Sequence, residues 1–483
     1  MWQIWVKVMR GGRNDRNNNK KDIIWNYLGT FLNLGINFIL LPIFMFFLDN
    51  EYLALWYVFA SLGSIVNMFD FGFSPVLARN VAYAWCGAKS LQKNGVEHVG
   101  DGEDTEPNYS LLGNVIASCR VLYFGIGLAA FLVLLTAGTV YIKSVSSHLN
   151  QLICMSSWAI FIISVFLNLS LGYYAVVLRG VGAIGDYNRA TSFGKIFQVL
   201  ISATLLWFGF GLFAVSFANL VYGLMSRILY RRALSCLSGM SGHEGALNAR
   251  CCLRDSFDVF ATIWHNAWRE GLVSFAKYLT TQAGTIVVTT FLGLSASGIY
   301  SISMQIATAI GSVSSALFNS FSPAIQNAYA VRNYEKMRAL LAKSMFAYAV
   351  LFVFGMMGVY LFGIPILEVI GKSYKFDPLV MFCVACFVFV YQRHANYAAF
   401  IANTNEIPYM NAYIISGIVG IALSSFVAWS MPRAGVAGMM LPQIIVQLAY
   451  NAWKWPSVAR KIMMVSRAEF LQMSLTSISR RKI

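Results

Sequence analysis

Long apolar stretches separated by short polar ones run through almost the whole chain. A helix needs about 20 apolar residues to cross a bilayer. Twelve stretches meet this requirement: 23–47, 53–73, 114–142, 151–176, 190–209, 211–230, 269–292, 296–319, 341–367, 378–401, 410–430 and 434–455. Within 190–230 and 269–319 the stretches are so close that splitting each region into two helices is the main uncertainty of the count. The pattern predicts an all-α integral membrane protein with about twelve transmembrane helices.

The overall composition favours a lipid environment over water. The chain is 58% hydrophobic and 12% charged, with a mean hydropathy of +0.61. Soluble domains average about 45–50% apolar and about 25% charged residues. Two soluble domains would fit the length of 483 residues, but they would expose large apolar patches.

The basic residues indicate an orientation. With the N-terminus inside, the predicted outer loops hold only four of the 36 Lys and Arg, namely Lys143, Lys372, Lys375 and Arg433. Basic residues accumulate in cytoplasmic loops. Both termini are therefore predicted to be cytoplasmic. This topology also explains the net charge of +16, so no nucleic-acid partner is needed to account for it.

The two halves of the chain share a faint repeat. Tyr27-Leu28 and Tyr278-Leu279 open the first and seventh stretches, while Phe73-Ser74-Pro75 and Phe321-Ser322-Pro323 end the second and eighth. Two six-helix halves of the same orientation would be parallel repeats, and many transporters bind substrate between such halves. The predicted organisation is a basic arm (1–22), a first bundle (23–230), a cytoplasmic linker (231–268), a second bundle (269–455) and a basic tail (456–483).

Motifs that carry catalysis are missing from the sequence. It has no HExxH, GxSxG, Walker A or usable GxGxxG motif. Its eight cysteines show no disulfide spacing, and Cys383 and Cys386 have no His or acidic cluster beside them. We therefore expect no enzymatic activity, no cofactor and no metal site.

Ionisable residues inside apolar stretches are the main functional candidates, because burying a charge in a bilayer is costly. Four cations form a candidate cavity for an anion that enters from the cytoplasm: Lys277, Arg393, Arg120 and Lys195, of which the last two are placed in the inner parts of their helices. Candidates for coupling an ion or proton are Asp70, Glu270 and His394. Snorkelling and helix-end pairing remain alternatives for Arg120, Lys195, Asp70 and Glu270.

Amide side chains within the helices add a second candidate feature. Gln282, Gln305, Asn319, Gln443 and Gln447 could line a path for a hydroxyl-rich sugar. Interhelical hydrogen bonding explains such residues at least as well.

Several motifs resemble those of a known family. The stretch from Trp25-Asn26-Tyr27-Leu28-Gly29 to Leu41-Pro42 looks like the first helix of bacterial polysaccharide flippases. The run from Phe69 to Asn80 is similar to the second-helix signature of Wzx-type O-antigen and polysaccharide exporters, and Gly298-Ile299-Tyr300-Ser301 and Phe321-Ser322-Pro323-Ala324 resemble the same family. The acidic stretch 97–106 has no place in that pattern.

The resemblance implies both a fold and a function. Its fold is that of the multidrug/oligosaccharidyl-lipid/polysaccharide (MOP) superfamily, with two six-helix bundles around a central cavity. Such proteins move undecaprenyl-pyrophosphate oligosaccharide across the bacterial inner membrane, coupled to a proton or sodium ion, and can work beside polymerase and chain-length partners. Lys277, Arg393 and Arg120 are the candidates for the cation-lined lumen that the family implies.

Two other functions remain open. A multidrug cation antiporter of the same superfamily would predict a cavity rich in buried acids, whereas the buried charges here are mainly cations. A membrane-embedded polymerase or ligase would need a large outer loop, and the longest predicted one, near 368–377, has about ten residues.

Overall fold

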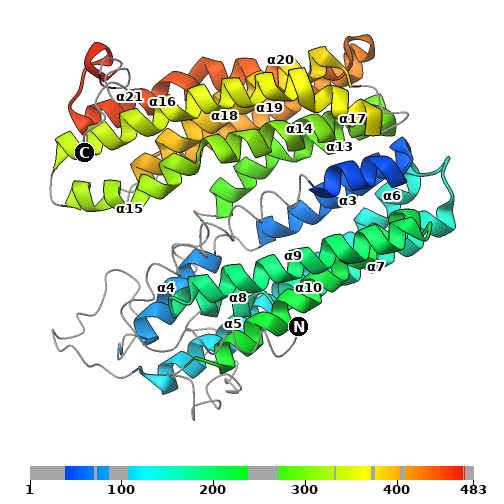
Figure 1. The fold of residues 1–483 in the computed structure, drawn as a ribbon, viewed down its shortest axis with the longest axis horizontal. Coiled ribbons are helices and arrows are strands. Elements are labelled where there is room, and N and C mark those ends of the chain that lie inside the picture. The colour runs from blue at the N-terminus through cyan, green and yellow to red at the C-terminus, as the bar shows by residue number, and fades with distance from the viewer. Residues whose placement is uncertain are drawn as a thin grey trace. The chain divides into compact units, whose positions relative to one another are not determined.

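A computed structural model describes residues 39–69, 73–85, 87, 107–237, 268, 271–330, 333–370, 376–402, 408–470 and 473. Every regular element within these ranges is helical (Figure 1). The chain divides into two compact units: unit 1 is Met1–Leu48 with Leu62–Ser274, and unit 2 is Asp49–Ser61 with Phe275–Ile483. The predicted linker 231–268 lies mostly outside the described residues.

The described helices confirm a multi-pass membrane protein. Seven of them are long and apolar enough to cross a membrane, and one bent pair adds an eighth. The seven are Tyr109–Val145, Gln151–Gly180, Ile184–Trp207, Gly211–Ser235, Tyr334–Val369, Pro378–Ala402 and Met410–Ser430. Each coincides with an apolar stretch predicted from the sequence, whereas most of the first predicted stretch, 23–47, lies outside the described residues.

Large apolar side chains on the surfaces of both units fit contact with lipid. Leu152 is 80% exposed, Val369 81% and Trp207 76%. Water would penalise such surfaces, whereas acyl chains do not. Trp207 and the exposed Trp429 lie near the ends of their helices, where amphipathic rings settle at a membrane interface.

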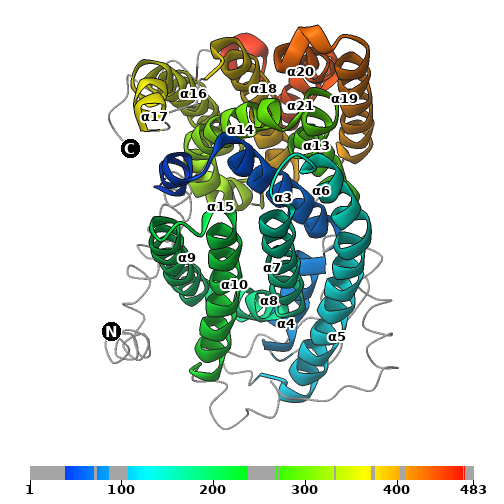
Figure 2. The ribbon, with the colours of Figure 1, turned by 90° about the vertical axis from the view of Figure 1, so that its right-hand side faces the viewer.

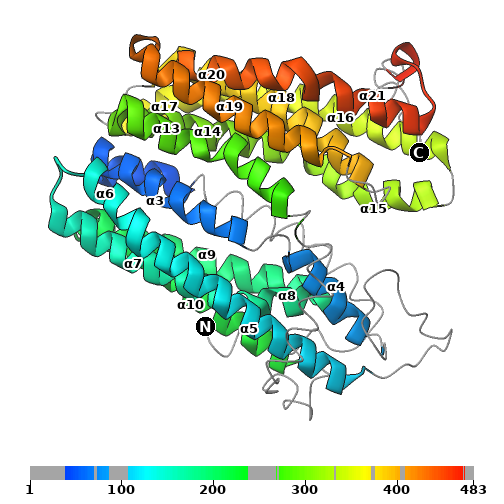
Figure 3. The ribbon, with the colours of Figure 1, turned by 180° about the vertical axis from the view of Figure 1, so that it is seen from behind.

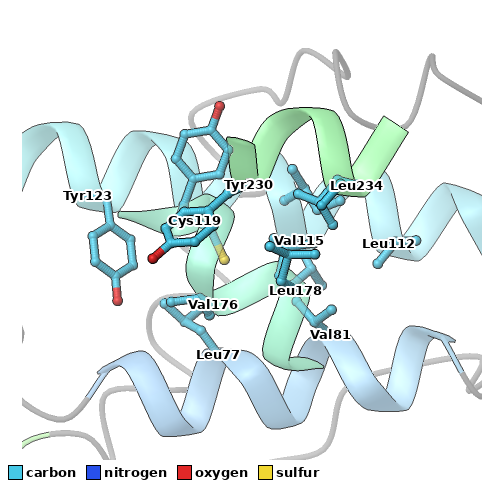
Figure 4. Close-up of a cluster of buried hydrophobic side chains, with 14 of the residues drawn as sticks. Leu77, Val81, Leu112, Val115, Cys119, Tyr123, Val176, Leu178, Tyr230 and Leu234 are labelled. Atoms are coloured by element: carbon cyan, nitrogen blue, oxygen red, sulfur yellow. The ribbon is translucent and has the colours of Figure 1, made fainter. Parts of the chain in front are cut away.

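Unit 1 is a bundle in which α10 lies along α9 and α7 (Figure 2). Its helices are α4 (Phe73–Trp85), α5 (Tyr109–Val133), η2 (Leu134–Gly138), α6 (Thr139–Val145), α7 (Gln151–Ser170), α8 (Tyr173–Gly180), α9 (Ile184–Trp207) and α10 (Gly211–Ser235). Helix α3 (Asn50–Phe69) contributes its C-terminal turns. Figure 4 shows the main apolar cluster, where Leu77, Val115, Val176 and Tyr230 meet from α4, α5, α8 and α10.

Unit 2 places α18 against α14, α20 and α21, and α19 against α13 and α20 (Figure 3). Its helices are α13 (Ala283–Leu292), α14 (Leu294–Ser314), α15 (Ala316–Ala330), α16 (Tyr334–Gly358), η4 (Val359–Gly363), α17 (Ile364–Ile370), α18 (Pro378–Ala402), α19 (Met410–Ser430), η5 (Pro432–Ala434), α20 (Gly435–Val446), η6 (Gln447–Asn451) and α21 (Ala452–Met463). A helical stretch at 271–281 precedes α13.

Glycine resolves the main uncertainty of the helix count. Gly209 separates α9 from α10 with φ +82°, and Gly293 separates α13 from α14 with φ +90°. Residues with a side chain rarely adopt such angles, so glycine permits a sharp turn within the three residues between α9 and α10 and the single residue between α13 and α14. Each closely spaced pair is therefore two helices.

The Phe-Ser-Pro motifs occupy a different place from the one predicted. The sequence placed them at the ends of membrane-spanning helices, but α3 ends at Phe69 and the first motif begins α4. The second lies inside α15, which bends by 43° from α14. Proline lacks an N–H and fits the first turn of a helix, which explains Pro75 as part of a helix start. Each motif therefore belongs to a short helix that follows a longer one.

Candidate functional site

The four cations predicted from the sequence lie in different surroundings. Arg120 and Lys195 are half-buried in unit 1, whereas Lys277 and Arg393 are exposed residues of unit 2. Asp70 and Glu270, two of the three coupling candidates, lie outside the described residues. The third, His394, is buried in α18.

Lys195 belongs to a cluster of cationic, aromatic and amide side chains between α7, α9 and α10. Its Nζ lies 4.4 Å from the centroid of the Tyr222 ring and donates to Gln198 Oε1 at 3.2 Å. Lys195 is the twelfth of the 24 residues of α9. The helix begins earlier than predicted because it continues through the polar residues Asp186 to Arg189, which an apolar pattern does not reveal. The predicted place of Lys195 in the inner part of the helix stays a prediction.

Arg227 of α10 is a second cation of this cluster, which sequence reasoning missed. Its Nη2 donates to the carbonyl oxygen of Asn168 at 3.0 Å, and its guanidinium lies 5.7 Å from the centroid of the Tyr230 ring. Its Nε is buried without a hydrogen-bond partner among the described residues. We call Lys195, Gln198, Tyr222, Arg227 and Asn168 the cation–aromatic cluster.

Two glycines let the helices of the cluster approach closely. A Cβ atom at Gly194 of α9 would collide with Ser226, and one at Gly223 of α10 would collide with the Asn168 amide. Small residues allow such approach at helix interfaces in membranes. The spacing of Gly223 and Arg227, one turn apart on α10, was the signal in the sequence that could have indicated Arg227.

Among the described residues, the groups that contact Lys195 and Arg227 are neutral. Neither Lys195 nor Arg227 forms an ion pair within the described part of the chain, where Arg189 and Asp186 pair at 3.4 Å. A cation over an aromatic face gains about 2 kcal/mol when desolvated. A charge at the bilayer centre costs about 2.5–3.5 kcal/mol even on insertion scales. The rings therefore offset only part of the cost, and the two positive charges remain able to attract an anion.

Arg120 repeats the cation–aromatic contact at another place in unit 1. Its guanidinium lies 5.8 Å from the centroid of the Tyr173 ring, between α5 and α8. Arg120 and Lys195 therefore each lie against a tyrosine ring, at separate places in unit 1.

Unit 2 contains a buried polar core of a different kind. His394 Nδ1 lies 2.9 Å from the Tyr413 hydroxyl, and Tyr391 and Tyr413 place ring edges against the imidazole. The Gln447 side chain lies near the ring, but Nε2 of His394 has no hydrogen-bond partner among the described residues. His394 is only 1% exposed, so bulk water does not reach it in this structure.

Asn451 is the centre of this polar core. Its Nδ2 donates to Ser416 Oγ and to Gln447 Oε1, both at 2.9 Å, and its Oδ1 accepts from Trp455 Nε1 at 2.8 Å. The bond to Ser416 joins the helix of Asn451 to α19. We call His394, Tyr413, Ser416, Gln447, Asn451 and Trp455 the polar core of unit 2.

A π-helical turn aligns the polar core. Gln443, Gln447, Asn451 and Trp455 follow one another at intervals of four and are all buried. An α-helix has 3.6 residues per turn, so this spacing overshoots each turn by about 0.4 residue. The wider turn of η6, at Gln447–Asn451, takes up the drift and keeps the side chains on one face.

The amide residues predicted to line a sugar path differ in how deeply they are buried. Gln443 is 3% exposed, and neither atom of its amide has a hydrogen-bond partner among the described residues. Gln282 and Asn319 are exposed, and Gln305 is half-buried. The carbonyl oxygen of Gln282 accepts a hydrogen bond from Ser61 at 2.9 Å.

Among the described residues, no group of three His, Cys, Asp or Glu side chains could hold a metal ion.

Comparison with known proteins identifies the fold. No family model matches the chain, and no curated protein matches its sequence. A multidrug resistance MATE family transporter of the MOP superfamily, in its inward-facing conformation, is 14% identical with a TM-score of 0.64, over 91% of this chain and 96% of that one. The outward-facing conformation of such a transporter is also 14% identical, with a TM-score of 0.61 and coverage of 92% and 96%.

A flippase has a similar fold. The lipid II flippase MurJ, in an inward closed conformation, is 12% identical with a TM-score of 0.61, over 95% of this chain and 91% of that one. At these identities the likeness concerns the fold alone. This chain has the MOP transporter fold, as the sequence resemblance implied. The finer assignment, to Wzx-type exporters, remains a prediction.

Proposed function

We propose that the protein is a flippase that carries an undecaprenyl-pyrophosphate-linked oligosaccharide from the cytoplasmic to the periplasmic leaflet of the bacterial inner membrane. It works as a transporter by alternating access, without enzymatic chemistry or ATP hydrolysis. The observation that carries the proposal is the cation–aromatic cluster, in which Lys195 and Arg227 lie within membrane-spanning helices without an acidic partner among the described residues.

A pyrophosphate group suits this cluster chemically. Lysine binds phosphate as a point charge, and arginine binds it through its planar fork of donors. Because the aromatic faces compensate the two cations only in part, an anionic headgroup would lower the cost of burying Lys195 and Arg227. The fold agrees with lipid transport, since a lipid II flippase shares it.

A multidrug cation antiporter is the second candidate, favoured by the fold of the MATE transporters. Positive charge in the cluster would repel a cationic drug, which makes this function less compatible with unit 1. Coupling to a proton or sodium ion is part of the flippase proposal, with Asp70, Glu270 and His394 as its candidates. Polymerase and chain-length proteins remain expected partners.

Reconstituted vesicles test the proposal directly. We expect purified protein to move a fluorescent polyprenyl-pyrophosphate sugar between leaflets without ATP, under a proton or sodium gradient. Lys195→Gln and Arg227→Gln should each slow transport at least ~10-fold, because a hydrogen bond to a charged group contributes about 1.5–3 kcal/mol. Lys143→Gln removes the same charge from an exposed position in α6 and should leave the rate unchanged.

Three results would contradict all or part of the proposal. Absence of lipid movement under every gradient would exclude the flippase. Unchanged rates in both cluster variants would exclude the cluster as the headgroup site. Efflux of a cationic dye without lipid movement would favour the antiporter instead.

A further inference from the structure

Two tyrosines and two arginines of unit 1 are joined by an unbroken series of contacts. The rings of Tyr187 in α9 and Tyr230 in α10 are stacked, with their centroids 5.3 Å apart and their planes at 24°. The Arg227 guanidinium lies over the Tyr230 ring, 5.7 Å from its centroid. The Arg179 guanidinium of α8 lies over the Tyr187 ring, 5.6 Å from its centroid. We call these four residues the Arg–Tyr stack.

Hydrogen bonds hold the Tyr230 ring in place. Thr191 Oγ1 donates its hydrogen to the Tyr187 carbonyl oxygen at 2.8 Å. A hydroxyl has one hydrogen to donate, so Thr191 accepts from the Tyr230 hydroxyl, which lies 2.7 Å away. Tyr230 is only 2% exposed. The ring beneath Arg227 is therefore fixed both at its face and at its hydroxyl by α9.

The orientation of Arg227 depends on this ring. Its guanidinium forms a hydrogen bond through Nη2 to the Asn168 carbonyl oxygen at 3.0 Å. Its Nε is buried without a hydrogen-bond partner among the described residues. A planar guanidinium that is bonded at one nitrogen can swing about that bond unless a flat surface limits it. The Tyr230 ring provides this surface.

The Phe-Ser-Pro motif of α4 contacts the other end of the stack. Arg179 Nη2 donates to Ser74 Oγ at 2.6 Å. Helix α8 also packs directly on α4, since a Cβ atom at Gly180 would lie 2.6 Å from the Ala78 carbonyl oxygen. A serine of the motif is therefore connected to Arg227 through side chains that touch one another.

Packing of the helices does not by itself explain the cation in this place. Helices α9 and α10 already approach closely where Gly194 meets Ser226, and α7 and α10 do so where Gly223 meets Asn168. Half-burial of Arg227 adds a desolvation cost that such packing does not require. A preorganised donor, in contrast, binds an anion better than a mobile one, because less freedom is lost on binding.

We propose that Tyr230 is a positioning residue of the headgroup site, because it holds the Arg227 guanidinium in the cation–aromatic cluster. Through Arg179 and the rest of the Arg–Tyr stack, Ser74 of the Phe-Ser-Pro motif acts on the same guanidinium. The inference rests on the proposed function, in which Arg227 binds the pyrophosphate of the carried lipid. It gives a role to a motif that lies outside the cluster.

A double-mutant cycle tests the proposal, with undecaprenyl pyrophosphate bound to the full-length protein in a neutral detergent and measured by native mass spectrometry. Tyr230→Leu should weaken binding about fivefold, because it removes a cation–aromatic contact. In the Arg227→Gln background the same substitution should change binding less than about twofold, since the group that it positions is gone. Tyr230→Phe keeps the ring and should stay within about twofold of wild type.

A matched control removes a stacked ring elsewhere in α10. Phe213 stacks on Phe217 with centroids 6.2 Å apart, and Phe213→Leu should leave lipid binding unchanged. Equal losses from Tyr230→Leu in the two backgrounds would overturn the proposal, because the ring would then have a structural role only. Wild-type binding in Tyr230→Leu would overturn it as well. Unchanged melting temperatures confirm that the variants are folded.

Chemical labelling separates this inference from the transport function. Phenylglyoxal modifies accessible arginines, and peptide mass spectrometry reports the labelled fraction of Arg227 without any lipid. We expect Tyr230→Leu to raise the labelling rate about fivefold, because the guanidinium is released from the ring. Ser74→Ala should raise it about twofold, since its contact is indirect.

The labelling results also distinguish the two proposals. Unchanged labelling of Arg227 in Tyr230→Leu would overturn the positioning role, and unchanged labelling in Ser74→Ala would overturn the part that the motif plays. If wild type bound no undecaprenyl pyrophosphate while Tyr230→Leu still raised the labelling, the flippase proposal would fail and the positioning of Arg227 would stand.

Discussion

The two units bury polar groups within their helices in opposite ways. Unit 1 buries positive charge and stabilises it with aromatic faces and amide oxygens, as at Lys195 over Tyr222. Unit 2 buries neutral groups that hydrogen-bond one another around Asn451. A satisfied neutral network mainly stabilises a fold, whereas a partly compensated cation can bind a ligand. We therefore propose that the cluster of unit 1 binds the ligand, whereas the polar core of unit 2, apart from the coupling candidate His394, mainly holds its helices together.

The largest expected effect on stability comes from Asn451→Ala. It removes three hydrogen bonds, and side-chain hydrogen bonds between membrane helices average about 0.6 kcal/mol. The free energy of unfolding should therefore fall by about 2 kcal/mol, measured by denaturant titration in micelles. Asn219→Ala in unit 1 removes one bond, to Ser164 Oγ at 3.2 Å, and should cost about a third as much. Equal losses of unfolding free energy in the two variants would contradict the contrast between the units.

Gly223→Ala tests the close approach of α7 and α10 in unit 1. The new Cβ would meet the Asn168 side chain, and overpacking costs typically about 1–3 kcal/mol. We expect a loss of about 1.5 kcal/mol in the free energy of unfolding, together with slower lipid transport because Asn168 also positions Arg227. Gly125→Ala is the control, since nothing lies within 4 Å of its Cβ. A variant with wild-type stability and transport would show that the contact is not required.

Gln443→Leu should have the smallest effect on stability, and it should stabilise the protein where the other two variants destabilise it. Both atoms of the buried amide lack hydrogen-bond partners within the described chain, and leaving such groups unpaired costs about 1–3 kcal/mol. Replacement by an apolar side chain of similar size should raise the free energy of unfolding by about 1 kcal/mol without changing transport. Loss of transport would instead place Gln443 in the substrate or ion path.

Much of the fold could be predicted from the sequence because the bilayer imposes a simple requirement. Apolar stretches long enough to span the membrane had to be helices, so α5, α7, α16, α18 and α19 were found at nearly their observed positions. Helix ends were harder, because a helix can continue through polar residues, as α9 does before Arg189. Breaks such as the one at Gly293 require a backbone angle that hydropathy does not report.

The candidate site was predicted only in part. Lys195 was identified because a charge in an apolar stretch is conspicuous, but Arg227 lies near the polar end of α10 and looked like a basic residue at a helix end. Arg393 was grouped with Lys277 by its position in the helix. In the structure both residues are exposed and belong to unit 2.

The sequence by itself determined that this protein crosses a membrane with many helices and that its intramembrane charges are mainly positive. Both follow from composition and spacing, which act locally along the chain. The tertiary structure decided which charges meet aromatic rings and which amides satisfy one another. Those relations depend on contacts between helices far apart in sequence, such as Asn451 with Ser416 and Arg227 with Asn168, and only packing brings them together.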